Sequence, residues 1–98
     1  GNYWLKISLV GTQSNRTAVG AKVKVVAGKL TQISVVHSGR SYQSHYGQGL
    51  HFGLGRHLRI DTIEIIWPSG LHSIYRNIPT NRNLVLQEGQ TQVQYERQ

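Results

Sequence analysis

Apolar and polar residues alternate along most of the chain with a period of two, as they do in a strand that is buried on one face. No helical stripe of ten or more residues is present. The alternating segments lie at residues 5–9, 21–25, 33–35, 50–54, 63–67, 84–86 and 93–95. Seven or eight short strands at this spacing predict an all-β single domain, either an antiparallel β-sandwich or a flattened barrel.

The apolar members of the alternating segments predict the core of this fold. A side chain as large as that of Trp67 buries about 150–250 Å² and is expected to anchor the core. The full predicted core set is Leu5, Ile7, Val23, Val25, Ile33, Val35, Phe52, Leu54, Ile63, Ile65, Trp67 and Leu86.

Turn residues lie between the alternating segments, as hairpins require. In WPSG (67–70), Pro68 holds φ at about −65° and Gly70 accepts left-handed backbone, so a hairpin is expected over 60–76. Gly28 predicts a tight turn between two further strands. The remaining connections are expected as a tight turn at 88–91 and as loops at 11–20 and 77–83.

The chain has 98 residues, the size of one domain, and residues 1–98 are expected to form a single β domain. It contains no cysteine, which excludes disulfides and thiolate metal clusters. It also contains no methionine, which predicts that the chain is a piece of a longer protein. No apolar run approaches the about 20 residues of a membrane span. The net charge is +7, but the basic residues are dispersed, which argues against a nucleic-acid-binding patch.

The segment HSGRSYQSHYGQGLHFGLG (37–55) is rich in glycine and histidine and suggests two kinds of ligand site. A phosphate loop needs glycines just before a helix, whereas these glycines straddle the alternating Leu50, Phe52 and Leu54, so a phosphate loop is excluded. Gly53 is instead expected at a β-bulge or at a close approach of two backbones. The histidines lack the HxH and HExxH spacings of zinc ligands, so neither a metal nor a cofactor is expected.

The sequence also lacks the combinations of residues that catalysis needs. A serine–histidine–aspartate triad needs a carboxylate that orients a histidine, and Asp61 and Glu64 lie at the start and on the outward face of a predicted strand. No GxSxG nucleophile elbow is present. A glycosidase needs paired carboxylates, but Glu88 precedes a turn glycine and Glu96 lies near the end of the chain. The chain is therefore expected to be non-catalytic.

Four segments, taken in order, resemble a known family. They are SNRTAVGAKVKVVAG (14–28), SGRSYQSHYGQGLHFGLG (38–55), IEIIWPSG (63–70) and NIPTNRNLVLQEG (77–89). Together they resemble the ASPIC/UnbV domain, with a match that covers residues 2–89. The resemblance implies a non-catalytic accessory module of a secreted, periplasmic or cell-surface protein. It also implies a preceding β-propeller of FG-GAP/VCBS repeats, which would hold the calcium sites.

Some positions in the segments that resemble the family have a structural interpretation, and others suggest binding. The structural positions are Asn15, Gly20, Phe52, Gly53, Trp67, Pro68 and Gly70. Arg16, Arg40 and Tyr42 lie in the two longest loops, and arginine and tyrosine are enriched where interfaces concentrate their energy. We expect them to contact the preceding propeller or a protein partner. In the alternative interpretation, Arg16 and Arg40 bond loop carbonyls or Asp61 within the domain.

A second functional hypothesis is a β-sandwich that binds carbohydrate or a polyanion, with an anionic glycan as the ligand. Lys22 and Lys24 alternate with buried positions, so they are expected on an outward sheet face. Lys6 is expected on the same face, with Tyr3 and Trp4 nearby. A sugar site would expose planar aromatic rings, whereas a polyanion site would bind with a steep salt dependence.

Overall fold

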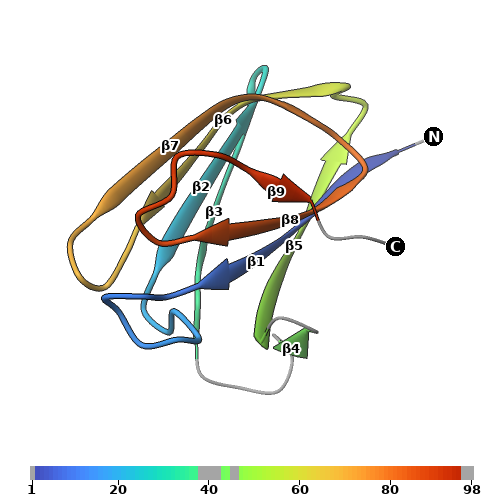
Figure 1. Cartoon of the computed structure of the whole chain (residues 1–98). Coiled ribbons are helices and arrows are strands. Elements are labelled where there is room, and N and C mark those ends of the chain that lie inside the picture. The colour runs from blue at the N-terminus through green and yellow to red at the C-terminus, as the bar shows by residue number, and fades with distance from the viewer. Residues whose placement is uncertain (1, 38–42, 45–46, 96–98) are drawn as a thin grey trace.

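The structure is a computed structural model of the chain and describes residues 2–37, 43–44 and 47–95. In these ranges the chain forms nine strands and no helix (Figure 1). The strands are β1 (Tyr3–Val10), β2 (Lys22–Ala27), β3 (Leu30–Val35), β4 (Gln43–Ser44), β5 (Gly47–Gly55), β6 (Arg59–Ile66), β7 (His72–Pro79), β8 (Arg82–Gln87) and β9 (Gln94–Tyr95). Seven or eight strands were predicted, and β9 falls in the alternating segment at 93–95, whereas the two-residue β4 lies in none of the alternating segments.

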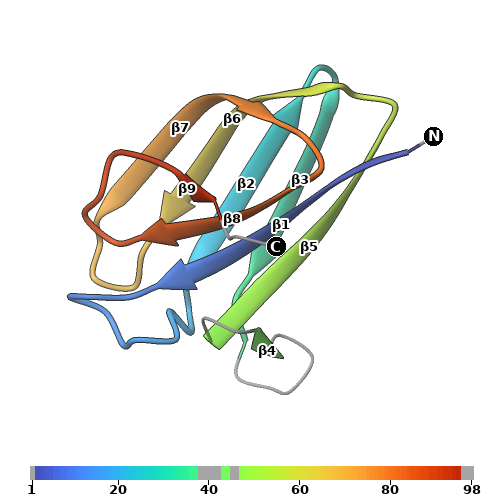
Figure 2. The ribbon, with the colours of Figure 1, turned by 45° about the vertical axis from the view of Figure 1, so that its right-hand side comes forward.

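The strands form two sheets that pack as a sandwich, as predicted, and not as a closed barrel. The five-stranded sheet has the order β4-β5-β1-β8-β9, and the four-stranded sheet has the order β3-β2-β6-β7 (Figure 2). One pairing departs from the predicted antiparallel arrangement, because β1 and β8 run parallel. The chain leaves β7 in one sheet and enters β8 in the other, where it lies beside β1 in the same direction.

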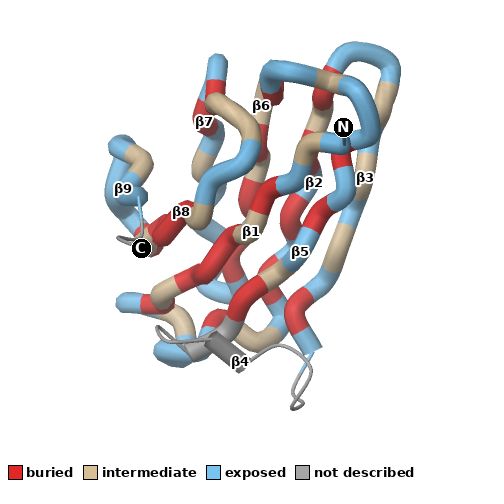
Figure 3. Tube along the Cα trace, turned by 90° about the vertical axis from the view of Figure 1, so that its right-hand side faces the viewer, coloured by how far each residue is buried: buried red, intermediate tan, exposed pale blue. Residues whose placement is uncertain are grey.

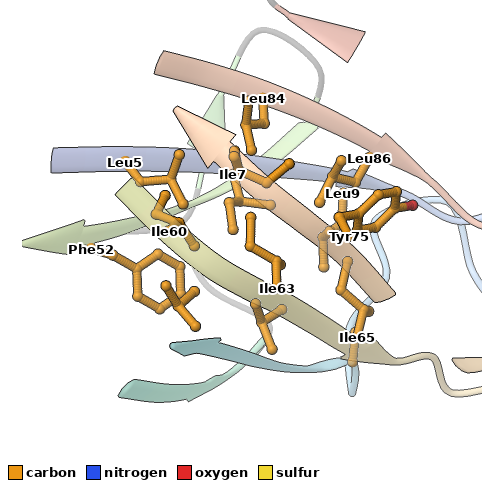
Figure 4. Close-up of a cluster of buried hydrophobic side chains, with 14 of the residues drawn as sticks. Leu5, Ile7, Leu9, Phe52, Ile60, Ile63, Ile65, Tyr75, Leu84 and Leu86 are labelled. Carbon is orange, nitrogen blue, oxygen red and sulfur yellow. The ribbon is translucent and has the colours of Figure 1, made fainter. Parts of the chain in front are cut away.

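The core lies between the two sheets and is built from apolar side chains. The buried residues of both sheets are red in Figure 3. Leu5, Ile7 and Leu9 of β1 lie over side chains of β6 such as Ile63 (Figure 4). Ten of the twelve predicted core residues are buried, and Trp67 is only 1% exposed. The alternation in the sequence therefore identifies most of the inner face of each sheet.

The prediction was wrong for Ile33 and Val35, which are 56% and 39% exposed. Both residues lie on β3, an edge strand, and Ile33 is the register partner of the exposed Lys24. Gln32, which precedes Ile33, is paired with the buried Val25, and its side-chain amide donates a hydrogen bond to the carbonyl of Gly53 on β5. The period of two was correct, but the polar Gln32 faces inward, where its side chain joins the two sheets.

The WPSG hairpin forms as predicted between β6 and β7. Gly70 has a φ of +98°, and its amide donates a hydrogen bond to the Trp67 carbonyl at 2.8 Å. The predicted loop at 77–83 is shorter than expected, because β7 extends to Pro79 and β8 begins at Arg82. At the end of this short crossing, the Asn81 side chain accepts a hydrogen bond from the Trp4 amide, which ties the crossing to β1.

A β-bulge lies beside Gly53, where the β1–β5 register shifts between Tyr3 and Trp4. Trp4 is the register partner of Gly53, whereas Tyr3 is the partner of Gly55. A Cβ atom placed on Gly53 would meet nothing within 4 Å. Gly53 therefore lies beside a bulge, as predicted, and no close backbone approach requires a glycine there.

Candidate functional site

Three distant segments meet at one end of the sandwich, around the carboxylate of Glu88. They are the 11–20 loop, the 67–70 turn and the residues just after β8. The backbone amide of Glu88 donates to the Val10 carbonyl at 2.9 Å, which fixes the residue beside the end of β1. We call Glu88 with Thr12, Gln13, Ser14 and Ser69 the Glu88 clamp.

The two carboxylate oxygens of Glu88 accept five hydrogen bonds. Oε1 accepts from three consecutive backbone amides, those of Thr12 at 2.9 Å, Gln13 at 3.0 Å and Ser14 at 2.8 Å. Oε2 accepts from the hydroxyl of Ser14 at 2.9 Å and from the hydroxyl of Ser69. The amide of Ser69 in turn donates to the Ser14 hydroxyl at 3.0 Å, so loop and turn are joined directly as well.

These contacts determine the charge of Glu88, which is only 2% exposed. Burial alone would raise the pKa of the carboxyl, since a charge is costly to bury. The hydrogen bonds from the Ser69 hydroxyl, the amides of Ser14 and Thr12 and the Ser14 hydroxyl outweigh burial and lower the pKa to about 2. Glu88 is therefore ionised at neutral pH.

The arrangement suits Glu88 for holding the loop and not for chemistry. A carboxylate offers about four lone-pair sites, and five donors already occupy them. No lone pair remains for a substrate or metal, and an acid with so low a pKa holds no proton to donate at neutral pH. The clamp instead fixes the 11–20 loop against the 67–70 turn.

The remaining structural positions of this region lie around the clamp. The Asn15 side chain spans its own loop, with Oδ1 accepting from the Val19 amide at 2.9 Å and Nδ2 donating to the Val19 carbonyl at 3.1 Å. Gly20 has a φ of +98°, and a Cβ there would lie 3.5 Å from Cγ of Pro68. The indole of the buried Trp67 donates to the Ser73 hydroxyl at 2.9 Å.

The predictions for the two loop arginines, Arg16 and Arg40, have different outcomes. Arg16 is exposed, and among the described residues its guanidinium has no hydrogen bond or ion pair. Asp61, its predicted internal partner, accepts instead from the Gly28 amide at 2.8 Å. The interpretation in which Arg16 braces its own loop thus has no contact to support it. Arg40 and Tyr42 lie outside the described residues.

A second candidate site is the outer face of the four-stranded sheet. The strand registers place its residues in three rows that cross the sheet from β3 to β7. We call this surface the apolar–cationic face. Its rows are Val35–Lys22–Ile66–His72, Ile33–Lys24–Glu64–Ile74 and Thr31–Val26–Thr62–Arg76.

The apolar–cationic face exposes four large apolar side chains between charged ones. Ile33 and Ile74 are 56% and 50% exposed, and Val35 and Ile66 are 39% and 37% exposed. An open hollow of about 200 Å³ on this face is lined by Lys22, Lys24, Ile33, Glu64 and Ile66. The hollow is smaller than the about 300–1,000 Å³ typical of small-molecule pockets.

The predicted grouping of three lysines on one face was wrong. Lys22 and Lys24 share the outer face of β2, but Lys6 lies on β1 in the other sheet, as do Tyr3 and Trp4. Period-two alternation shows that a residue points outward, but it does not show which of two sheets carries the strand.

In the described part of the chain, no three histidine, aspartate or glutamate side chains are grouped so that they could hold a metal ion. None of the described residues forms a helix long and apolar enough to cross a membrane. Glu88 is the site residue that sequence reasoning missed. Its partners Thr12, Gln13 and Ser14 lie 74 to 76 residues away, so no local spacing indicates the contact.

The model of the ASPIC and UnbV family matches residues 11–93, which is most of the chain. The chain belongs to the ASPIC and UnbV family. The matched region contains the whole Glu88 clamp and the whole apolar–cationic face. No curated protein and no solved structure shows significant similarity to the chain.

Proposed function

We propose that this ASPIC/UnbV domain is a non-catalytic accessory module of a secreted or envelope protein and binds a protein partner through its apolar–cationic face. The partner is a neighbouring domain of the natural protein, such as a β-propeller, or a separate protein. The observation that carries the proposal is the exposure of four large apolar side chains together on this face. Exposed apolar side chains that gather on one face and are rimmed by polar residues are typical of interaction surfaces.

The charged residues of the face also support a binding role. Lys22, Lys24 and Arg76 are exposed, and among the described residues none of them has an ion pair. Lys24 and Glu64 are register partners on neighbouring strands, but no ion pair joins them. These charged groups are therefore free to pair with a partner.

The non-catalytic part of the proposal is supported by the chemistry of the Glu88 clamp. Its carboxylate is saturated with hydrogen bonds and ionised, so it offers neither a proton nor a vacant acceptor site. The clamp joins Ser14 of the loop to Ser69, which lies between the ends of β6 and β7. Its role in the proposal is to hold the loop that carries Arg16 at that end of the sandwich.

Amine labelling tests whether a partner covers the face. The natural gene product is labelled in a non-denatured native extract, and the isolated 98-residue chain is labelled at the same reagent concentration. We expect Lys22 and Lys24 to be labelled several-fold more slowly in the extract. Lys29 is the control, since it is exposed in the β2–β3 turn and lies off the face.

Equal labelling of Lys22 and Lys24 in the two samples would contradict the proposal, because a bound partner must shield amines beside its contact. Slower labelling of all three lysines, Lys29 included, would indicate general shielding and would also count against a docking face.

A further inference from the structure

The outer face of the four-stranded sheet has an excess of positive charge that the described residues do not neutralise. Lys22, Lys24 and Arg76 lie on it with a single acid, Glu64. The chain has eleven basic side chains and only four acidic ones. Of those four, Glu88 is enclosed in its clamp and Asp61 is bonded to the Gly28 amide, so neither is available to the face.

The apolar part of the face has a shape that fits one side chain. Ile33 and Ile66 line the open hollow of about 200 Å³, with Lys22 and Lys24 from the strand between them. An apolar side chain placed there would contact both isoleucines. The residues on either side of that side chain would lie within reach of the lysine amines.

The dimensions of the face match those of a short extended segment of chain. Four strands spaced about 4.8 Å apart span about 14 Å, and the three rows span about 13 Å along the strands. An extended chain of about four residues covers 13 Å.

We propose that this face binds an acidic protein segment. One apolar side chain of the segment fills the hollow between Ile33 and Ile66, and the neighbouring carboxylates pair with Lys22 and Lys24. The inference rests on the proposed function and adds the chemistry of the partner to it.

Charge also argues against a second copy of the chain as the occupant. A symmetric dimer places the same patch on both sides of the interface. Each copy would bring Lys22, Lys24 and Arg76 against the same cations of the other, and like charges facing each other across an interface are strongly unfavourable. An acidic segment matches the face where a second copy does not.

The test selects ligands for the isolated chain from a displayed library of random 12-residue peptides. We expect the enriched peptides to be acidic, with at least one large apolar residue between the acids. A synthetic copy of one such peptide is then titrated against the chain by fluorescence anisotropy. Raising the salt concentration should weaken this binding, because the lysines of the face are exposed.

Matched variants locate the binding. The double variant Lys22→Gln, Lys24→Gln removes two exposed ion pairs and should weaken binding about 2- to 30-fold. Ile33→Ser should weaken it further by removing one wall of the hollow. Lys29→Gln removes an exposed lysine in the β2–β3 turn and should change the affinity less than twofold. All four substituted side chains are exposed, so the folded domain should be retained, as checked by thermal unfolding.

Three results would overturn the inference. The first is enrichment of neutral or basic peptides, or of acidic peptides that bind the double variant equally well. The second is a heparin hexasaccharide that binds the face more tightly than any selected peptide, which would identify a polyanion site. The third is a dimer in analytical ultracentrifugation that the double variant abolishes. In each case, protection of Lys22 and Lys24 from labelling in the extract would still support the proposed function, in which a partner covers this face.

Discussion

Glu88→Gln is expected to remove most of the acid sensitivity of the domain's stability. The folded state lowers the pKa of this carboxyl from its ordinary value of 4.5 to about 2. Because the folded pKa is the lower one, the ionised form stabilises the fold fully above pH 4.5. That contribution is lost as the pH falls from about 5 towards 2, where the folded carboxyl takes up a proton.

The magnitude follows from the difference between the two pKa values. At about 1.4 kcal/mol per pH unit, lowering the pKa from 4.5 to about 2 corresponds to about 3 kcal/mol of stability at neutral pH. The side chain is only 2% exposed, so solvent screening reduces this value little. A domain is stable by about 5–15 kcal/mol in total, so the loss is large enough to measure.

Urea unfolding at several pH values between 2 and 7 measures the effect. We expect the wild-type free energy of unfolding to fall by about 3 kcal/mol between pH 5 and pH 2 through this group. Glu88→Gln should be less stable by a similar amount at pH 7 and should approach the wild type at pH 2. Glu64→Gln, on the outer sheet face, is the matched control and should keep the wild-type acid dependence. A Glu88→Gln variant as acid-sensitive as the wild type would refute the role assigned to the clamp.

Four further substitutions test the fold by thermal or urea unfolding. Phe52→Ala should cost about 3–5 kcal/mol, because its ring is 4% exposed in the core, and an unchanged melting temperature would contradict that placement. Gly20→Ala should destabilise the domain by about 1 kcal/mol or more, since the φ of Gly20 is +98°. Gly53→Ala should be neutral or slightly stabilising, because the added Cβ would meet nothing within 4 Å. Ile33→Thr should change stability by less than about 0.5 kcal/mol, and a cost of several kcal/mol would mean that Ile33 is packed in the core after all.

The strands and most of the core were predictable because an inward-facing residue recurs at every second position of a half-buried strand. The same rule could not assign the inner face of β3. There the inward Gln32 uses its amide to bond the Gly53 carbonyl across the sandwich, and the apolar Ile33 and Val35 point outward. At an edge strand, a polar side chain that joins the sheets can take the place of an apolar one.

The site was less predictable than the fold, because its contacts are long-range. The sequence indicated that Lys22 and Lys24 point outward, but only the strand pairing shows that Ile33 and Ile66 stand beside them. The role of Glu88 depends on donors at the other end of the chain. Neither feature has a local spacing that sequence reasoning can recognise.

Isoleucine methyl spectroscopy tests the central claim most directly, namely that the outer face of the four-stranded sheet is the surface that a partner covers. Spectra of the isolated chain and of the natural gene product in its native complex are compared. We expect the methyl signals of Ile33, Ile66 and Ile74 to shift, because these exposed side chains become buried against the partner. The signal of the fully buried Ile7 should stay in place. Unchanged signals for all three outer isoleucines would contradict the account.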